Sequence, residues 1–475
     1  MKEPLSESVA TLPDRTDVVI LGAGGAGYPA AFFLDRAGMS VVMVDPIGNL
    51  GGDCLAEGCV PSKAIREAAL VRRLTEKYAH FGLQGGACNA DWPAVQKHKD
   101  RVQQIRYTQH EAQIAASNVT FVKGRGAVIA PDRVRITAPD ATAAHEVEFR
   151  YLILATGSRP TRLSIPGAEL AITSHDLFRF GSDITQPKHI IIIGGGYIGV
   201  ETASMLQGLG TKATIMEFTP QLLPGFDSEL SEFLRAHLEE RIDILLSAKV
   251  TAIERIGGGY SVSYLQNGQE HARRCDAVLM STGRAPVLPE GVEYLALRFE
   301  EGRLAVDETL RTSNQRVWAP GDVNARSMLF HSAVRQSLVA AHCIAAGGQA
   351  VERMNFAAVP MTVFSEPELA HVGLTAEQAE STLGIGAVSV TRYSYDVDSR
   401  AQIYGECDGF LKLVFDRRDG KLLGAQIAGI DAAQLIAPLA LAIERGLGAV
   451  DLAATAFPHP MISEGLAHAA RAFRP

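Results

Sequence analysis

Two cysteines could carry redox chemistry in this chain. Cys54 and Cys59 lie five positions apart, flanked by glycines and followed by Pro61, Ser62 and Lys63. A proline suits the first turn of a helix, because its missing N–H costs nothing there. We therefore expect Cys59 near a helix N-terminus, where the helix dipole and Lys63 favour a thiolate. A thiol of low pKa beside a second thiol forms a redox pair.

The same two cysteines could instead be buried structural residues or half of a zinc site. A zinc site needs two further Cys or His ligands at metal spacing. The four remaining cysteines are isolated from one another. We favour the redox pair over these alternatives, and we expect no metal.

Composition narrows the class of protein. A chain of 475 residues suggests about three domains. The net charge of −8 argues against a nucleic acid or an anionic membrane as partner. The stretch from Met1 to Thr16 has no apolar core of a secretory signal, and no uncharged apolar run is long enough to span a membrane. We expect a cytoplasmic protein, in which closely spaced cysteines are more often catalytic than structural.

The elements that would position this chemistry begin with a glycine-rich turn upstream of the cysteines. The order is a short apolar strand at 17–21, a turn with Gly22, Gly24 and Gly27, a helix at 28–36 and a strand at 40–44. Such glycines let a pyrophosphate reach the helix N-terminus. Asp45, at the end of the second strand, suits the ribose 2′-hydroxyl. We predict a dinucleotide site here.

The same pattern recurs in the middle of the chain. The order is a strand at 189–193, a turn with Gly194, Gly196 and Gly199, a helix from about 197 to 209, and a strand at 212–216. Glu217 follows, and in both units the acid lies 23 residues after the first glycine. The acid favours a free 2′-hydroxyl, and no Arg follows directly, so we favour NAD over NADP. Two units indicate two dinucleotides.

With these motifs in their order, the chain resembles the flavin-dependent pyridine nucleotide–disulfide oxidoreductases, and within them most closely the dihydrolipoamide dehydrogenases. The resemblance runs from about residue 15 to about 470. Further matching motifs lie at 155–157, 281–286, 317–323, 328–333 and 457–464. The resemblance implies an α/β fold with two Rossmann-like dinucleotide-binding domains, one for FAD and one for NAD, and a C-terminal α+β dimerisation domain.

We expect four segments along the chain. Residues 1–156 form the first part of the FAD-binding domain, 157–282 the NAD-binding domain, 283–352 the return to the flavin site, and 353–475 the dimerisation domain. Alternating stretches between 119 and 154 suit antiparallel strands. Residues 409–416 and 422–429 suit a hairpin that turns at Asp419 and Gly420.

The resemblance also implies which residues bind the cofactors. In it, Asp322 contacts the ribityl hydroxyls and Lys63 lies against the flavin N5 region. The residues expected to bind FAD or NAD are Gly22, Gly24, Gly27, Asp45, Gly52, Lys63, Thr156, Gly157, Gly194, Gly196, Gly199, Glu217, Gly283, Arg284, Gly321, Asp322 and His331.

The catalytic roles come from the same resemblance. Cys54 would face the substrate and Cys59 the flavin, with Lys63 paired to Glu201. His459 would be the acid–base catalyst, oriented by Glu464, and the pair would reach the cysteines of the other subunit. Physical chemistry agrees, since a thiol substrate needs a base with a pKa near 7 and a carboxylate fixes the tautomer of a histidine. A homodimer with shared active sites follows.

The function expected is that of a dihydrolipoamide dehydrogenase. It would oxidise dihydrolipoyl groups on a lipoyl-bearing protein of a multienzyme complex, using NAD⁺ and a Cys54–Cys59 redox disulfide. The alternative is an NAD(P)H-dependent reductase of another small or protein disulfide. Mercuric reductase is disfavoured because it uses a C-terminal pair of cysteines, and no cysteine follows Cys407 here. Glutathione reductase is disfavoured because Glu217 lies in the expected pyridine-nucleotide site. The complete catalytic set disfavours a flavoprotein that serves only as a scaffold.

Four departures from the family pattern involve five residues. Asp53 stands where Thr is usual, and its charge could raise a thiol pKa. Ala56 replaces the usual Asn, Phe330 a small residue, and Phe457 with Pro458 the frequent His-Ala. None removes a catalytic group, and together they suggest a specialised branch that serves a dedicated lipoyl protein.

Overall fold

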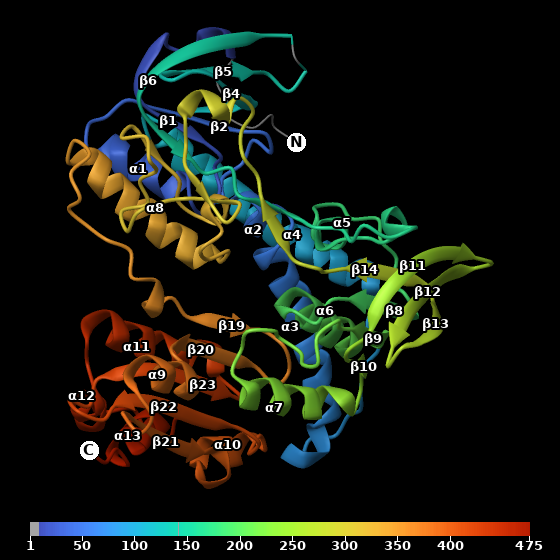
Figure 1. The fold of residues 1–475 in the computed structure, drawn as a ribbon. Helices are drawn as coiled ribbons and strands as arrows, with labels where there is room; N and C mark the ends of the chain where they lie inside the picture. The colour runs from blue at the N-terminus through green and yellow to red at the C-terminus, as the bar shows by residue number, and fades with distance from the viewer. Residues whose placement is uncertain (1–8, 141) are drawn as a thin grey trace.

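The computed structural model describes residues 9–140 and 142–475, so the first eight residues of the expected FAD segment lie outside it. Figure 1 shows three lobes: one built mainly from the N-terminal chain and α8, one from the green middle of the chain, and one from the orange and red C-terminal part. None of the helices in the described ranges has the length and apolar character of a membrane span.

The first lobe is built on a mixed sheet with strand order β3-β2-β1-β6-β5-β4, and β18 pairs with β6. The strands are β1 (Arg15–Leu21), β2 (Val41–Asp45), β3 (Thr120–Lys123), β4 (Arg125–Ala130), β5 (Arg133–Thr137), β6 (Ala144–Leu154) and β18 (Val317–Trp318). Helices α1 (Tyr28–Arg36) and α8 (Phe330–Ala345) pack together against this sheet. β18 joins this sheet from far along the chain, beside β6.

The expectation of antiparallel strands across 119–154 is wrong for the first of them. β3 pairs with β2 in parallel, whereas β4, β5 and β6 pair antiparallel. The reason is connectivity. The chain between β2 and β3 holds α3 (Cys59–Glu76) and α4 (Trp92–Ala115), and a helical crossover brings a strand back in the same direction.

The second lobe holds a parallel sheet of order β10-β9-β8-β14. Its strands are β8 (His189–Ile193), β9 (Lys212–Met216), β10 (Asp243–Leu245) and β14 (Ala277–Met280), and its helices are α6 (Tyr197–Gly208) and α7 (Ser228–Glu239). An antiparallel sheet of β11 (Lys249–Ile256), β12 (Gly259–Gln266) and β13 (Gln269–Cys275) extends from it. The isoleucines of β8 are almost fully buried, as their continuous apolar run requires.

Two chain crossings join these lobes. β7 (Ser158–Pro160) and β15 (Arg284–Pro286) run antiparallel to each other, and the short helix α5 (Ser174–Phe178) follows the first crossing. A separate small ribbon is formed by β16 (Phe299–Glu300) and β17 (Arg303–Leu304).

The C-terminal lobe is a five-stranded sheet of order β19-β20-β23-β22-β21, with helices packed on it. Its strands are β19 (Met361–Val363), β20 (Leu369–Gly373), β21 (Val388–Ser394), β22 (Phe410–Asp416) and β23 (Leu422–Ala428). Its helices are α9 (Ala376–Leu383), α10 (Ser399–Tyr404), α11 (Ala432–Arg445), α12 (Ala449–Ala454) and α13 (Glu464–Arg471). The predicted hairpin of β22 and β23 is confirmed. The predicted α/β fold class with its C-terminal α+β domain is confirmed as well.

Candidate active site

The redox segment lies directly against the first glycine turn. Cys54 belongs to α2 (Gly52–Ala56), and α3 begins at Cys59. Gly52 has a φ of +53°, and a Cβ on it would lie 2.9 Å from the Cα of Gly24. Only glycine allows these two backbone segments to approach so closely.

The two cysteines differ in acidity. Both are free thiols in this structure, and the Cys54 thiol lies within hydrogen-bonding reach of the Cys59 sulfur. That hydrogen bond is the largest cause that lowers the pKa of Cys59, and the charge of Lys63 lowers it further against the effect of burial. The same contact, together with burial, raises the pKa of Cys54. Cys59 is therefore the more acidic of the two thiols.

Lys63 is fixed by an ion pair. Its Nζ lies 2.6 Å from Oε2 of Glu201 and 4.5 Å from the centre of the Phe364 ring. Glu201 in turn accepts the backbone N–H of Phe364 at 2.9 Å through its other oxygen. The lysine thus presents its charge to Cys59 from a defined position.

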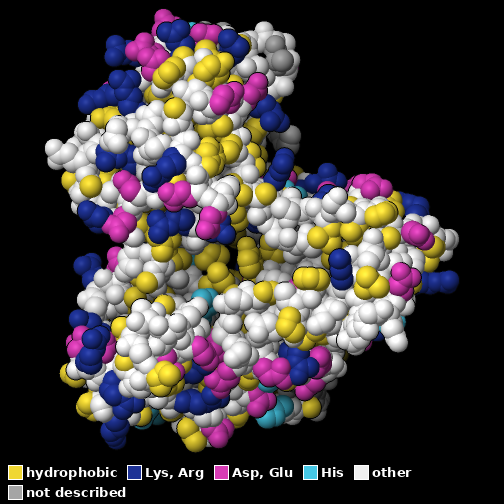
Figure 2. Space-filling model, in the orientation of Figure 1, with side chains coloured by type: hydrophobic (Ala, Val, Ile, Leu, Met, Phe, Trp, Pro, Cys, Tyr) yellow, Lys and Arg dark blue, Asp and Glu magenta, His cyan; other side chains and the backbone are white. Residues whose placement is uncertain are grey.

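A cavity of about 1020 Å³ extends from the first glycine turn to the thiols. Figure 2 shows the surface hollowed where the three lobes meet, with hydrophobic side chains around the hollow. The site residues expected from the sequence that line this cavity are Gly22, Gly24, Asp45, Gly52, Cys54, Cys59, Lys63, Thr156, Gly157, Glu201, Arg284, Asp322 and His331. Its volume lies at the upper end of the range for ligand sites, as a dinucleotide requires.

The first turn fits a bound FAD. A Cβ on Gly22 would lie 2.1 Å from the Ala155 carbonyl oxygen, and one on Gly27 would lie 1.9 Å from the Gly22 carbonyl oxygen. Asp45 accepts the backbone N–H groups of Ala23, at 2.9 Å, and of Ile47, at 2.8 Å. Burial raises the pKa of this carboxyl. The turn is therefore closed by backbone contacts and presents an acid to the cavity.

The second turn repeats this geometry, with its three glycines outside the lining of the cavity. A Cβ on Gly199 would lie 2.0 Å from the Gly194 carbonyl oxygen, and Gly196 has open space around it. Glu217 accepts the N–H of Gly195 at 2.6 Å and that of Thr219 at 2.7 Å. These residues could hold the NAD that the sequence predicts.

The two crossings place polar groups along the cavity wall. Ser158 donates to Asp322 at 2.5 Å, and the Arg284 Nε donates to Ser158 at 2.7 Å. Burial is the main cause of the raised pKa of Asp322. His331 lies 2.7 Å from the Pro360 carbonyl oxygen at the start of α8. Gly157, Gly283 and Gly321 all have positive φ, which suits the sharp bends at these points.

His459 and Glu464 lie together, away from the thiols of their own chain. His459 Nδ1 is 2.9 Å from Glu464 Oε2, and the histidine side chain is 72% exposed. Within the described residues, neither side chain lines the cavity. A single chain therefore does not bring this pair to Cys54.

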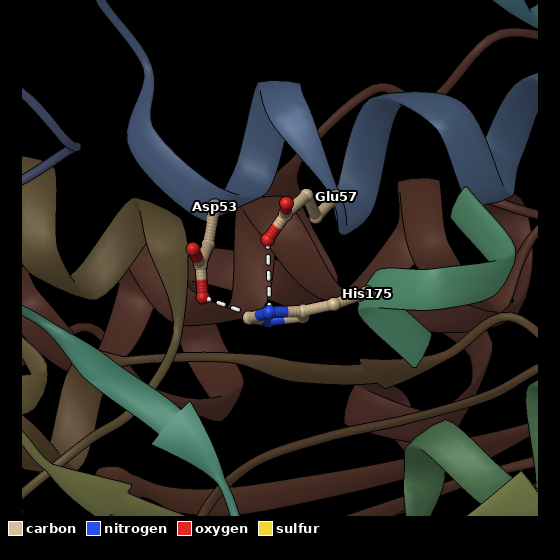
Figure 3. Close-up of side chains that lie close together, drawn as sticks. All are labelled: Asp53, Glu57 and His175. Carbon is tan, nitrogen blue, oxygen red and sulfur yellow. Dashed lines mark ion pairs between the residues drawn. The ribbon is translucent and has the colours of Figure 1, made fainter. Parts of the chain in front are cut away.

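The sequence interpretation did not identify His175 and Glu57 as charged residues beside Cys54. His175, on α5, lies 3.1 Å from Asp53 Oδ2 through Nε2 and 2.8 Å from Glu57 Oε2 through Nδ1. Figure 3 shows both carboxylates pointing from α2 and its C-terminal end toward this one imidazole. Arg284 contacts Asp53 as well, so the charge of Asp53 is compensated. The spacing of Asp53 and Glu57 around Cys54 could have signalled a missing cationic partner, but nothing local pointed to His175.

The chain is similar to proteins of known family along most of its length. Residues 16–337 match the pyridine nucleotide-disulphide oxidoreductase family, and residues 359–470 match the dimerisation domain of that family. The chain is 34% identical to a dihydrolipoyl dehydrogenase of Geobacillus stearothermophilus, over 95% of this chain and 94% of that one. It is 33% identical to that of Bacillus subtilis, over 96% of both chains.

A solved structure is also similar. It is the Cu(II) complex of the HOCl-induced flavoprotein disulfide reductase RclA from Escherichia coli, at 26% sequence identity. The TM-score is 0.84, and the match covers 97% of this chain and 100% of that one. The comparison extends the same fold across all three lobes.

Proposed function

Because this chain belongs to the pyridine nucleotide-disulphide oxidoreductase family, we propose that it is a dihydrolipoyl dehydrogenase acting on lipoyl groups of a partner protein. The family assignment makes it an oxidoreductase that uses FAD and a nicotinamide dinucleotide. Its dimerisation domain supports a homodimer. The substrate, the sharing of the active site between subunits and the use of NAD rather than NADP are parts of the proposal.

The observation that carries the proposal is a pair of thiols at one end of a dinucleotide-sized cavity, with the Lys63–Glu201 ion pair beside them. The pKa of Cys54 is raised and that of Cys59 is lowered, partly by the charge of Lys63. In a disulfide exchange the thiol of lower pKa is the better leaving group. A substrate thiolate that attacks Cys54 in the Cys54–Cys59 disulfide would therefore expel Cys59. The names of the relatives at 32–34% identity support a dihydrolipoyl group as the source of that thiolate.

The chemistry of the residues then follows in order. His459 of one subunit takes the proton of the substrate thiol, with Glu464 holding its Nδ1, and the thiolate forms a mixed disulfide with Cys54 of the other subunit. The second substrate thiol attacks the substrate sulfur of that mixed disulfide, which releases the cyclic disulfide and leaves Cys54 and Cys59 reduced. When bound, FAD supplies a two-electron relay between this dithiol and the nicotinamide. Lys63 stabilises the Cys59 thiolate throughout.

A disulfide reductase that works in the opposite direction is the second candidate. The similarity to the E. coli flavoprotein disulfide reductase over 97% of the chain favours it. The same residues serve both directions, because thiol–disulfide exchange is reversible.

Anaerobic mixing of the holoenzyme with dihydrolipoamide and NAD⁺ tests the proposal. We expect NADH to form, and we expect Cys54→Ser and His459→Ala each to lower the rate by at least about 100-fold. Cys407→Ser, at an exposed and isolated cysteine, is the matched control and should behave as the wild type. A protein whose flavin is reduced by NADH but that forms no NADH from dihydrolipoamide would instead be a reductase of another disulfide.

A further inference from the structure

The ionic cluster beside Cys54 is formed by residues from three separate parts of the chain. Asp53 and Glu57 lie on α2 and at its C-terminal end, His175 on α5, and Arg284 on β15. Both imidazole nitrogens face carboxylate oxygens, at 3.1 Å and 2.8 Å. Arg284 Nη1 lies 3.4 Å from the imidazole, and the guanidinium contacts the same Asp53 oxygen that His175 faces.

The ionic cluster anchors α2, a short helix with few other side-chain contacts that would hold it in place. The helix has five residues, and its N-cap, Gly51, has a φ of +101° and offers no side-chain cap. Gln103 holds its C-terminal end by donating to the Leu55 and Ala56 carbonyl oxygens at 3.0 and 2.8 Å. At the Cys54 turn itself, the side-chain anchors that the structure shows are those made by Asp53 and Glu57.

The helix that carries His175, α5, is fixed at both of its ends. Thr173 and Asp176 form a capping box at the N-terminal end. At the C-terminal end, the buried Lys99 donates to the carbonyl oxygens of Phe178 and Arg179. A five-residue helix tied in this way is a rigid support for an imidazole.

We propose that His175 is a positioning residue that, as an imidazolium between Asp53 and Glu57, holds the α2 turn and sets the redox equilibrium of the Cys54–Cys59 pair. With His175 charged, the two carboxylates are balanced by His175 and Arg284. Without that charge the cluster carries one net negative charge beside the thiols. A nearby negative charge disfavours formation of a thiolate, so reduction of the disulfide becomes less favourable. The proposal rests on Cys54 and Cys59 being the redox pair, but it holds for either substrate.

The charge states agree with the geometry. Burial alone would lower the pKa of His175, but hydrogen bonds and charges from Asp53 and Glu57 raise it to about 9. Burial alone would raise the pKa of Asp53, but His175 and then Arg284 hold it below its usual value. Tyr107, on α4, also faces this cluster: burial, with the charges of Glu57 and Asp100, raises its pKa to about 12, so it stays neutral.

The sign of the pH dependence follows. The imidazolium is fully present below the ordinary histidine pKa, and it is lost as the pH rises through about 9. Asp53 keeps its charge across that range, because its pKa is lowered. The contribution of His175 is therefore present at neutral pH and disappears in alkaline solution.

Each imidazole nitrogen of His175 faces a carboxylate, and this arrangement favours a proton on both nitrogens over a metal ion bound to one of them. The Asp53, Glu57 and His175 ligand atoms lie within 4.8 Å of one another, which would suit a metal site. However, one metal ion would bind only one imidazole nitrogen, and the Arg284 guanidinium already contacts Asp53. A metal is therefore an outcome for the experiment to exclude.

The test is an anaerobic redox titration of the purified holoenzyme against reduced and oxidised dithiothreitol, with the thiols trapped by alkylation and measured by mass spectrometry. At pH 7 we expect His175→Gln to shift the equilibrium about tenfold toward the disulfide, about 30 mV for a two-electron couple. The shift should shrink to nothing by about pH 10, where the wild-type histidine is also neutral. His271→Gln, at an exposed histidine of β13, is the matched control.

A double variant separates this role from simple misfolding. Glu57→Gln with His175→Gln removes one charge of each sign, so it should restore the wild-type equilibrium at pH 7. An unchanged equilibrium in His175→Gln, a shift that persists at pH 10, or failure of the double variant to restore the equilibrium would each overturn the proposal. A wild-type equilibrium that responds to Zn²⁺ while His175→Gln does not would overturn it in favour of a metal site. The titration uses no lipoyl substrate, so its outcome is independent of whether dihydrolipoamide is oxidised.

Discussion

The two glycine turns are nearly the same piece of backbone in two different surroundings. The first glycine has a φ of +110° in one and +106° in the other. A Cβ there would lie 2.1 Å from the Ala155 oxygen in the first turn and 2.5 Å from the Ser281 oxygen in the second. In both, the acid at the end of the next strand accepts an N–H of the turn, from Ala23 in one and Gly195 in the other.

The surroundings differ. The first turn lines the large cavity and abuts the redox segment at Gly52. The glycines of the second turn do not line that cavity, although Tyr197 and Ile198 between them do, and Phe218, directly after the acid of this turn, is 68% exposed. The same turn geometry therefore occurs in two surroundings, and in the first of them its glycines face the cavity that also holds the two thiols.

The largest expected effect breaks the first turn. Gly27→Ala would place a Cβ 1.9 Å from the Gly22 carbonyl oxygen. We expect the protein to lose most of its flavin and about 3 kcal/mol of its free energy of unfolding. Flavin absorbance after denaturation and a thermal melt measure both. Gly86→Ala, where nothing lies within 4 Å, is the control. Full flavin content in Gly27→Ala would contradict the resident role of this turn.

A smaller effect is expected at the second turn. A Cβ on Gly196 would meet no protein atom within 4 Å, so Gly196→Ala should fold and keep its flavin. It should obstruct an approaching pyrophosphate, and we expect the Kd for NADH to rise about tenfold, or about 1.4 kcal/mol. NADH titration, followed by quenching of protein fluorescence, gives the Kd. An unchanged Kd would mean that the dinucleotide binds elsewhere.

The smallest effect concerns the choice of nucleotide. Glu217→Gln can still accept the N–H of Gly195 through its amide oxygen, so the turn should persist. The lost charge weakens the expected bond to a ribose hydroxyl, and we expect the preference for NADH over NADPH in kcat/KM to fall about fivefold. Glu240→Gln, on the surface after α7, is the control. A preference for NADPH in the wild type would reject the assignment of NAD.

Much of the fold could be predicted because its signals are local. The predicted helix at 28–36 is the observed α1, and the predicted strands at 189–193 and 212–216 are the observed β8 and β9. Apolar runs, glycines and a following acid lie within some thirty residues of one another, so a short window contains the whole unit. Cys59 at the start of α3 follows in the same way from Gly58 and Pro61.

The sequence predictions failed where the structure depends on contacts between distant parts of the chain. The direction predicted for β3 was wrong. The crossover through α3 and α4 sets the direction of this strand, and the alternation of apolar and polar residues within it does not. The departure at Asp53 was noticed, but the compensation of its charge was not, because His175 and Arg284 lie more than 100 residues away in sequence.

The sequence by itself determined the two glycine-turn units, the closely spaced cysteines and the charge near Cys59, because each is encoded in residues that lie close together in the chain. Only the tertiary structure decided that the glycines of the first turn line the cavity whereas those of the second do not, and that Asp53 and Glu57 share one imidazole. Both features depend on which side chains meet across lobes. Those contacts are set by the packing of the lobes against one another, and no local pattern of residue types specifies them.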